Sequence, residues 1–289
     1  MTVRLSLITT CKGRLHHLQQ TLPRMAAQAD AECIVVDYGC PQGAGDWVRA
    51  NHPGVRIVRV DDDPHFNQCR ARNRGAIVAE TGLFCFVDAD ILLAPDFTSR
   101  ILDGWAPNTF LRARPVTIET WGSFACPREE FWRVGGYDEV FQGWGASPED
   151  LYLRLAGSGC AERHFAGSLL TALGHGDESR TAFYANKDRW WQHRANALYL
   201  IAKHDLAKVL GMELSLPQRQ ALYAQANLAI DGARATGSDR ATLDLTIEND
   251  TTRAINLLVQ VDRRLAYSIR WPGPAFPGAR PEPDAANAG

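Results

Sequence analysis

The chain has 289 residues, of which 45% are hydrophobic and 22% are charged, a composition typical of globular proteins. Its 31 basic and 33 acidic residues give a formal net charge of −2, so electrostatics give no reason to expect nucleic-acid binding. No run reaches the roughly 18 apolar residues of a membrane span, and the apolar run at the N-terminus is too short for a signal peptide. The seven cysteines form no CxxC pair, which favours free thiols. We therefore expect a cytoplasmic protein without a transmembrane segment.

Strand and helix patterns alternate through the first 90 residues. Strand-like runs lie at 3–9, 33–37, 55–60 and 83–87, and helical spacing lies at 16–28, 46–51 and 70–81. This order predicts an α/β fold, with a mostly parallel, Rossmann-like sheet flanked by helices. Ligands of such sheets bind at the carboxyl ends of the strands, where Thr9, Asp37 and Asp88 stand.

The pattern changes after residue 90. Further helices are predicted at 95–105, 129–134, 147–156, 184–212 and 217–235, and further strands at 112–120, 122–127 and 169–173. The segments 242–247 and 254–261 fit strands and short helices equally well. We expect a catalytic domain over 1–180, a mainly helical C-terminal extension over 181–271 and a disordered, proline-rich tail over 272–289. The extension could also support a homodimer.

Two carboxylates, Asp88 and Asp90, follow the fully apolar run at 83–87. Hard oxygen ligands of this kind suit Mn²⁺ or Mg²⁺, and these ions keep open positions for substrate phosphates. The alternative is an ordinary Asp-rich surface turn. The position at the end of a buried strand, after several βα units, favours the metal site.

Three other segments carry candidate binding residues. Thr9, Thr10 and Arg14 flank a loop whose backbone N–H groups and basic side chains suit a base or a phosphate, although it matches neither a P-loop nor GxGxxG. Asp37 could accept a hydrogen bond from a base N–H, and the helix start at 66–75 carries three arginines that could pair with diphosphate oxygens. The alternatives are an ordinary turn, a turn cap and a solvated helix face.

Taken together, these motifs resemble known glycosyltransferases. The segments Thr-Thr-Cys-Lys-Gly-Arg at 9–14, Val-Val-Asp at 35–37, Ala-Arg-Asn-Arg-Gly at 71–75 and Val-Asp-Ala-Asp at 87–90 have the order and spacing of family 2 glycosyltransferases, which adopt the GT-A fold. Further on, Val-Gly-Gly-Tyr-Asp-Glu and Phe-Gln-Gly-Trp-Gly, within 134–145, resemble the C-terminal half of family 7 galactosyltransferases and chondroitin-type polymerases. The resemblance covers about residues 3–180.

The resemblance implies metal-dependent transfer of a hexose or N-acetylhexosamine from a UDP-sugar to a glycan or other hydroxyl-bearing acceptor, usually with inversion. It assigns Asp37 to the uracil, Arg72 to the nucleotide region and Asp90 to the metal, with Asp88 near the ribose or the metal. It also implies a metal-ligating histidine after the last core strand, and His175 stands at that place.

Trp144, between two glycines, fits a mobile loop that closes over a sugar ring and excludes water. The alternative is a core tryptophan beside a turn.

The general base is the least settled feature. Related enzymes carry a Glu-Asp pair where this chain has Ser147 and Pro148, and Glu149 and Asp150 follow two residues later. Ser147 and Pro148 also fit the start of a helix, as N-cap and first-turn residue. We expect Asp150, or else Glu149, to act as the base. The alternatives are a retaining or inactive sugar-nucleotide-binding protein and, more remotely, a nucleotidyltransferase, for which the loop at 11–14 is a poor match.

Overall fold

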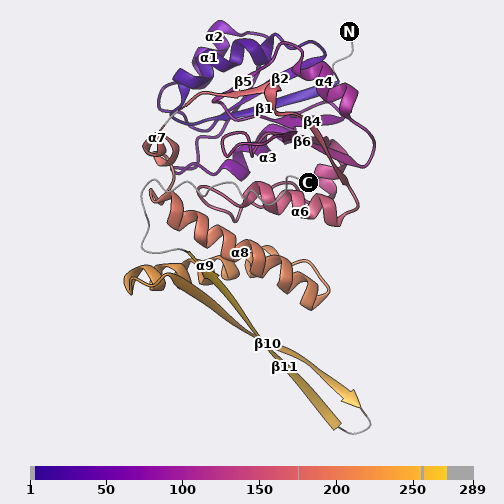
Figure 1. Ribbon diagram of the computed structural model, residues 1–289, viewed down its shortest axis with the longest axis vertical. Helices are drawn as coiled ribbons and strands as arrows, with labels where there is room; N and C mark the ends of the chain where they lie inside the picture. The colour runs from indigo at the N-terminus through magenta and orange to yellow at the C-terminus, as the bar shows by residue number, and fades with distance from the viewer. Residues whose placement is uncertain (1–3, 175, 255–256, 272–289) are drawn as a thin grey trace. The chain divides into compact units, whose positions relative to one another are not determined.

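The computed structural model describes residues 4–174, 176–254 and 257–271. The chain divides into two compact units, Met1–Asn196 and Ala197–Gly289, and Figure 1 labels most of their helices and many of their strands. His175 and the expected disordered tail at 272–289 lie outside the described residues.

A seven-stranded sheet forms the centre of the first unit, with strand order β3-β2-β1-β4-β7-β6-β8. The strands are β1 (Leu5–Cys11), β2 (Ala31–Asp37), β3 (Arg56–Arg59), β4 (Leu83–Phe86), β6 (Thr109–Arg114), β7 (Phe124–Pro127) and β8 (Ala161–Ala166). Neighbours pair in parallel except at β7, which runs antiparallel to both β4 and β6. The predicted α/β fold with a mostly parallel sheet is therefore confirmed.

Helices cover both faces of this sheet (Figure 1). They are α1 (Leu15–Ala26), α2 (Ala44–Asn51), α3 (Gln68–Val78), α4 (Phe97–Gly104), α5 (Arg128–Arg133) and α6 (Ser147–Gly157), followed by the short α7 (Asp177–Thr181). A separate two-stranded sheet pairs β5 (Ile91–Leu93) with β9 (Leu170–Ala172). This small sheet brings the segment after residue 169 next to the segment that follows β4.

The alternation of side chains along β1 explains the two layers of helices. Leu5 and Leu7 belong to one hydrophobic cluster with Leu18 and Leu22 of α1. On the opposite face, Ile8 lies against α3 at a glycine where an added Cβ would come within 2.4 Å of the Ile8 side chain. Successive residues of a strand point to opposite faces, so β1, which is buried along its whole length, is covered by helices on both sides.

Several elements differ from the sequence-based expectation: the strand expected at 112–120 is β6 at Thr109–Arg114, and β5 was not predicted. Helix α3 ends at Val78, before the predicted end at residue 81, because Ala79 takes an extended conformation (ψ 136°). Strand β8 was not predicted, because most of its side chains are exposed and polar. It lies at the edge of the sheet, where one-sided pairing needs no apolar pattern.

The second unit contains helices and a long hairpin. Helix α8 (Arg189–Leu210) includes the boundary between the units, and α9 (Leu216–Ala235) begins with a capping box formed by Ser215 and Gln218. The segments that fitted strands and short helices equally well form the hairpin of β10 (Arg240–Ala254) and β11 (Leu257–Arg270). In the part of the chain that the structure describes, no helix is both long and apolar enough to cross a membrane.

Candidate functional site

Two aspartates follow β4, and each lies beside an arginine. Asp88 Oδ1 accepts hydrogen bonds from Arg72 Nη2 at 2.7 Å and from Gln68 Nε2 at 3.1 Å. Asp90 Oδ2 forms an ion pair with Arg14 Nη1 at 2.9 Å. Four of these five residues were candidates from the sequence, and the structure places each aspartate beside one of the two arginines. The fifth residue, Gln68, was missed by the sequence analysis.

Arg72 is held in one position although it is a long, charged side chain. It is 2% exposed, and its Nη1 donates to the Tyr137 hydroxyl at 2.7 Å. The backbone at Gly122 passes close by: an added Cβ would lie 2.9 Å from Arg72 Nη2 and 3.3 Å from Asp88 Oδ2. Glycine at this position thus permits the close approach of the loop between β6 and β7.

Hydrogen bonds to the segment 137–141 hold α3 in place. Asn73 Nδ2 donates to the carbonyl of Tyr137 at 2.9 Å and to Glu139 Oε1 at 2.8 Å, and its Oδ1 accepts from the Tyr137 N–H. Asn67 Nδ2 donates to the carbonyls of Glu139 and Phe141. Hydrogen bonds therefore join the segment at 71–75 to the segment at 135–139. This contact fixes the position of Arg72.

The residues after β4 offer part of a metal-binding set. Asp88 Oδ2 makes no hydrogen bond among the described residues, and the two carboxylates are the hard donors that a divalent ion prefers. The backbone N–H of Leu173, just after β9, donates to the Asp90 carbonyl at 2.8 Å, so the chain approaches Asp90 there. Within the described ranges, no group of three or more His, Cys, Asp or Glu side chains could hold a metal ion. The third predicted ligand, His175, lies outside those ranges.

The ends of β1 and β2 hold the residues predicted to contact the nucleotide. Thr9 Oγ1 is buried and has no hydrogen-bond partner among the described residues, and Thr10 is 8% exposed. Asp37 is fully buried, and its two oxygens accept from the backbone N–H groups of Cys40 (2.8 Å) and Gly45 (2.9 Å). Asp37 thus stabilises the loop after β2, and its contact with a base stays a prediction.

A segment before α8 covers the loop after β1. Gly13 has φ +71°, and an added Cβ would overlap the Phe183 ring. The Phe183 carbonyl accepts from the Phe66 N–H at 2.8 Å, and the Phe66 and Tyr184 rings lie 5.6 Å apart. Sequence reasoning placed Tyr184 at the start of a long helix and so missed this contact. The signal that could have found it is the cluster Phe183-Tyr184, placed before the polar stretch 185–189.

The Gly-Trp-Gly loop is fastened to the first turns of α8. Asn196 is fully buried, and its Nδ2 lies within hydrogen-bond distance of the carbonyls of Gln142, Trp144 and Gly145. An added Cβ at Gly145 would lie 2.3 Å from the His193 ring. The glycines permit this close packing, whereas the sequence suggested that they make the loop mobile.

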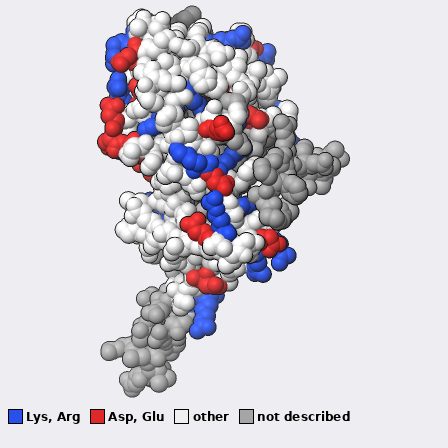
Figure 2. All heavy atoms as spheres, turned by 90° about the vertical axis from the view of Figure 1, so that its left-hand side faces the viewer, with Lys and Arg blue, Asp and Glu red and all other residues white. Residues whose placement is uncertain are grey.

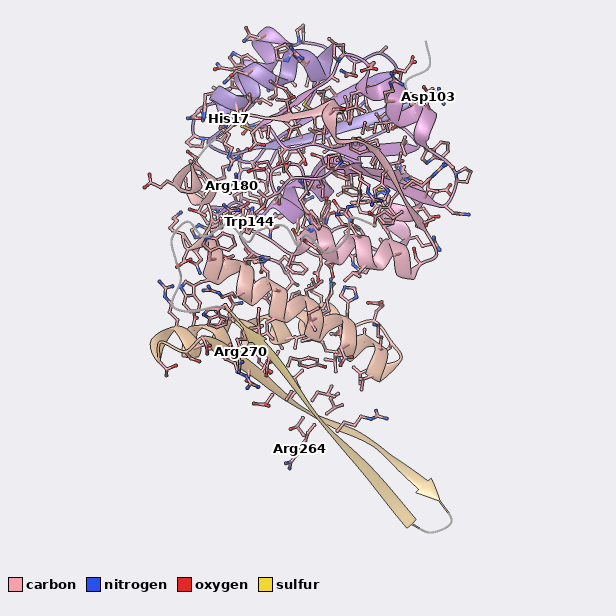
Figure 3. The ribbon with its side chains drawn as sticks, in the orientation of Figure 1. His17, Asp103, Trp144, Arg180, Arg264 and Arg270 are labelled. Carbon is pink, nitrogen blue, oxygen red and sulfur yellow. The ribbon has the colours of Figure 1, made fainter. Side chains whose placement is uncertain are left out.

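Trp144 itself is partly exposed (Figure 3). The Arg189 guanidinium lies 3.9 Å from the centroid of its ring, and the Trp190 ring meets it edge-on at 5.9 Å. The stacked guanidinium restricts the indole, and the exposed part of the ring remains open to a ligand.

The two candidate bases have different surroundings. Asp150 is fully buried, and its Oδ2 accepts from Arg154 Nε at 2.9 Å and Nη2 at 2.7 Å. This is a structural ion pair within α6. The sequence analysis preferred Asp150 as the base, and that role stays a prediction.

Glu149 Oε2 is buried and has no hydrogen-bond partner among the described residues. Burial raises the pKa of the Glu149 carboxyl, against weaker opposite effects of the Trp121 indole and the Arg112 guanidinium. Arg112 lies between the rings of Trp121 and Tyr152, with its Cζ 4.6 Å and 4.2 Å from their centroids. The Glu149 carboxyl is therefore an ionisable group in a largely buried environment, and its Oε2 could accept a hydrogen bond from a ligand.

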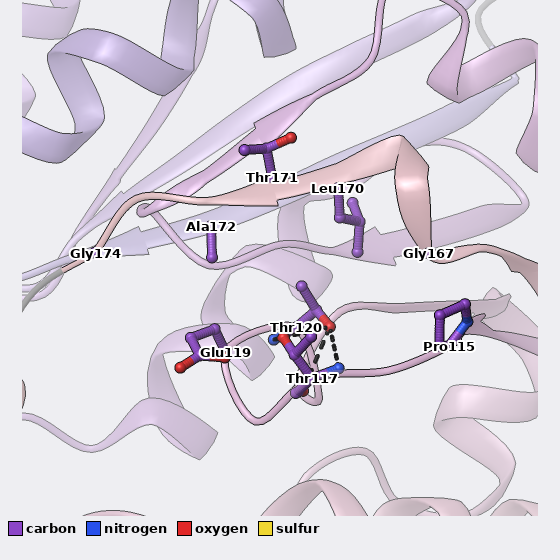
Figure 4. A pocket seen from close by; sticks show the side chains of 9 residues that line it. All are labelled: Pro115, Thr117, Glu119, Thr120, Gly167, Leu170, Thr171, Ala172 and Gly174. Carbon is purple, nitrogen blue, oxygen red and sulfur yellow. Dashed lines mark hydrogen bonds between the residues drawn. The ribbon is translucent and has the colours of Figure 1, made fainter.

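A cavity of about 420 Å³ opens between the β6–β7 loop and β9 (Figure 4). Its polar lining comes mainly from Thr117, Glu119, Thr120 and Thr171, and its apolar part from Leu170 and Ala172. It ends at Gly174, one residue beyond the backbone bond to Asp90. A space of this kind suits a compound rich in hydroxyl groups.

Comparisons with known proteins agree with this geometry. The model of glycosyl transferase family 2 matches residues 6–123, and a model described as the N-terminal domain of galactosyltransferase matches residues 112–175. Together they span the sheet and every described site residue up to α6. Over consecutive parts of residues 6–175, the chain is therefore similar to two families of glycosyltransferases.

Solved structures show the same fold as this chain. A mannosyltransferase of Pyrobaculum calidifontis, in complex with GDP-Man and Mn²⁺, has a TM-score of 0.54 and 17% identity, over 82% of this chain and 77% of that one. TarS 1–349 of S. aureus, in complex with UDP-GlcNAc, has a TM-score of 0.55 and 11% identity, over 81% and 73%. At such identities the likeness establishes the GT-A fold.

Validoxylamine A glucosyltransferases are similar in sequence. The protein of Streptomyces hygroscopicus subsp. jinggangensis (strain 5008) is 25% identical over 218 residues, which covers 54% of this chain and 52% of that protein. The match to the protein of Streptomyces hygroscopicus subsp. limoneus has the same identity and covers 48% of that protein. The chain thus spans about half the length of these curated relatives.

Proposed function

We propose that this chain is a metal-dependent, inverting glycosyltransferase that moves a hexose or N-acetylhexosamine from a UDP-sugar to an acceptor hydroxyl. The observation that carries the proposal is the pair Trp121-Gly122. Gly122 lies against Arg72 and Asp88, and Trp121 lies beside Glu149. Two adjacent residues therefore connect a carboxylate–arginine pair suited to a diphosphate with a buried carboxylate suited to proton transfer.

The donor end is supported by Asp88, Asp90 and their arginines. Asp90, Asp88 and the predicted ligand His175 would hold Mn²⁺ or Mg²⁺, and the ion when bound would stabilise charge on the leaving diphosphate. In the structure Arg14 neutralises Asp90, so metal binding would release this guanidinium for a phosphate oxygen. Arg72 stays with Asp88 because Tyr137 and burial hold it in place.

The acceptor end is supported by Glu149. Inverting transfer needs a base that takes the proton of the attacking hydroxyl. Glu149 Oε2 is available, whereas Asp150 accepts two hydrogen bonds from Arg154. The raised pKa of Glu149 makes its carboxylate a stronger base than an exposed carboxylate.

The cavity beside β9 is the proposed acceptor site. Its threonine hydroxyls and Glu119 can exchange hydrogen bonds with several sugar hydroxyls, and its apolar residues can contact a ring face. Its volume of about 420 Å³ has room for one or two sugar rings. A glycan or a similar polyhydroxylated compound therefore fits better than a long apolar acceptor.

The test is release of UDP from a panel of UDP-sugars, measured with Mn²⁺ and with EDTA. We expect Mn²⁺-dependent release from at least one UDP-hexose or UDP-N-acetylhexosamine, and product NMR should show the inverted anomer. Release from a GDP-sugar alone would contradict the UDP assignment. Binding of UDP without release from any donor, with or without candidate glycan acceptors, would support the inactive sugar-nucleotide-binding alternative.

A further inference from the structure

A pair of cysteines lies where the loops after β1 and β2 meet. Cys11 ends β1, opposite Asp37 in the parallel register, and the Tyr38 N–H donates to the Cys11 carbonyl at 3.0 Å. Gly39, with φ +57°, then turns the chain so that Cys40 returns toward the end of β1. Cys11 and Cys40 belong to one buried cluster, and Cys11 is the group that most lowers the pKa of Cys40, as expected for adjacent side chains. Both side chains are buried, and Cys40 retains 6% exposure.

The surroundings of Cys40 favour a thiolate. The Gly13 N–H donates to Cys40 Sγ at 3.2 Å, and the backbone N–H groups of Gln42 and Ala44 also point to the sulfur. Ala44 is the first residue of α2, so the positive end of the helix dipole adds to these donors. The effect of Cys11 and these backbone donors outweighs burial and lowers the pKa of Cys40 to about 5.

The other cysteines lack such an environment. Burial raises the pKa of Cys33 and Cys69 to about 12, and it also raises the pKa of Cys85, Cys126 and Cys160. Cys40 and burial raise the pKa of Cys11. The chain therefore places one thiolate next to one thiol, away from five inert thiols. Nothing in the proposed transfer reaction uses this pair.

We propose that Cys40 is a peroxide-sensitive modification site that forms a reversible disulfide with Cys11. The Cys40 thiolate attacks a peroxide oxygen, the O–O bond breaks, and after protonation the products are Cys40 sulfenic acid and water. The Cys11 thiol then attacks the sulfenic sulfur, which forms the S–S bond and releases a second water. The peroxide is reduced and the two thiols are oxidised; a dithiol such as DTT reverses the bond.

Disulfide formation would disturb the loop that carries Arg14. A disulfide holds its two sulfurs about 2.05 Å apart, closer than a sulfur hydrogen bond allows, and removes the anionic acceptor of the Gly13 N–H. Arg14 follows Gly13 directly and pairs with Asp90. If the proposed function is correct, oxidation should therefore weaken binding of UDP with Mn²⁺, by about tenfold if one charged contact is lost.

The experiment treats the full-length, reduced chain with hydrogen peroxide at pH 7, blocks the remaining thiols and maps disulfides by peptide mass spectrometry. We expect a Cys11–Cys40 cross-link that DTT removes, with the other five cysteines still alkylated. Cys40→Ser should abolish the cross-link, Cys11→Ser should leave Cys40 sulfenic acid that dimedone traps, and Cys160→Ser is the matched control that should behave as the native chain.

UDP titrations with Mn²⁺, before and after oxidation, separate the chemistry from its consequence. A cross-link with weakened UDP binding, absent in Cys40→Ser, supports the whole proposal. Absence of the cross-link while Cys40 is present and reduced overturns it. A cross-link with unchanged UDP affinity overturns the regulatory part. If the reduced chain does not bind UDP at all, the proposed function fails, and the peptide map still decides whether the modification site exists.

Discussion

Replacing Glu149 by Gln removes the proposed base and keeps the shape of the side chain. Glu149 Oε2 makes no hydrogen bond, so the substitution breaks no contact of that atom within the described part of the protein. General-base catalysis typically contributes about 10²–10⁴-fold. We therefore expect kcat to fall by roughly 10³, while Kd for UDP with Mn²⁺ stays within about twofold, because Glu149 lies at the acceptor end.

The pH dependence gives a second signature of the same group. The ionised carboxylate is the active form, so kcat should fall as the pH decreases through the pKa of Glu149. Because burial raises that pKa, the acid limb should lie above the range of an exposed glutamate. In Glu149→Gln this limb should disappear. The variant should also be at least as stable as the native chain at pH 7, because a raised carboxyl pKa destabilises the folded state where the group is ionised.

Asp150→Asn provides the contrast within the same helix. Asp150 is fully buried against Arg154, and breaking a buried ion pair costs about 3 kcal/mol or more. This predicts a decrease in Tm of roughly 10 °C for a unit of this size, and a kcat per folded molecule that falls far less than in Glu149→Gln. Steady-state UDP release and thermal unfolding measure both, with the exposed Glu129→Gln as control. Full activity in Glu149→Gln, together with inactivity of folded Asp150→Asn, would refute the assignment.

Three further substitutions test the donor side and the Gly-Trp-Gly loop. Gly122→Ala should raise the Kd of UDP with Mn²⁺ by about tenfold in titration calorimetry, because the added Cβ would lie 2.9 Å from Arg72 Nη2. The control is Gly54→Ala, whose added Cβ meets no atom within 4 Å. Equal UDP affinities of Gly122→Ala and the native chain would contradict the close approach. Arg14→Ala should tighten binding of Mn²⁺ alone, since Asp90 loses its partner, and should raise KM for the UDP-sugar; weaker binding of Mn²⁺ would argue against a metal role of Asp90. Asn196→Ala should lower Tm by roughly 5 °C and raise KM for the UDP-sugar, because three carbonyls of the Gly-Trp-Gly loop lose their donor. The control is Asn227→Ala on α9. An unchanged Tm of Asn196→Ala would show that other contacts hold the loop.

The first half of the fold follows from patterns that are local in the sequence. The apolar runs of β1, β2 and β4 are bounded by turn residues, and their parallel order follows from the helices between them. Strand β8 could not be predicted in this way, since an edge strand with exposed polar side chains has no apolar signal. The hairpin of β10 and β11 was ambiguous because each strand alternates weakly and pairs only with the other.

Candidate site residues could be named where charged side chains follow the end of a strand or lie in the next helix. Asp88, Asp90, Arg14 and Arg72 were named from the sequence, and the structure brings them together. Their pairing could not be read from spacing, because the partners are 16 and 76 residues apart. The role of Trp121 and Gly122 was missed because a Trp-Gly pair after a strand is not specific to any one structure or function.

The choice between Glu149 and Asp150 had a local signal that sequence reasoning did not use. Arg154 follows Asp150 by four residues, and such pairs meet on one face of a helix. That spacing assigns Asp150 to an ion pair and leaves Glu149 outside it. The burial that raises the pKa of Glu149 arises only in the tertiary structure, which also brings Trp121 and Arg112 to its carboxyl.

The most direct test of the account is the affinity for UDP, measured by titration calorimetry with Mn²⁺ and with EDTA, in the native chain and in Asp90→Asn. We predict that Mn²⁺ tightens UDP binding by about tenfold or more in the native chain, equivalent to ~1.4 kcal/mol, and has little effect in the variant. Equal affinities with Mn²⁺ and EDTA in the native chain, or an undiminished Mn²⁺ effect in Asp90→Asn, would contradict a metal–diphosphate site at Asp88 and Asp90.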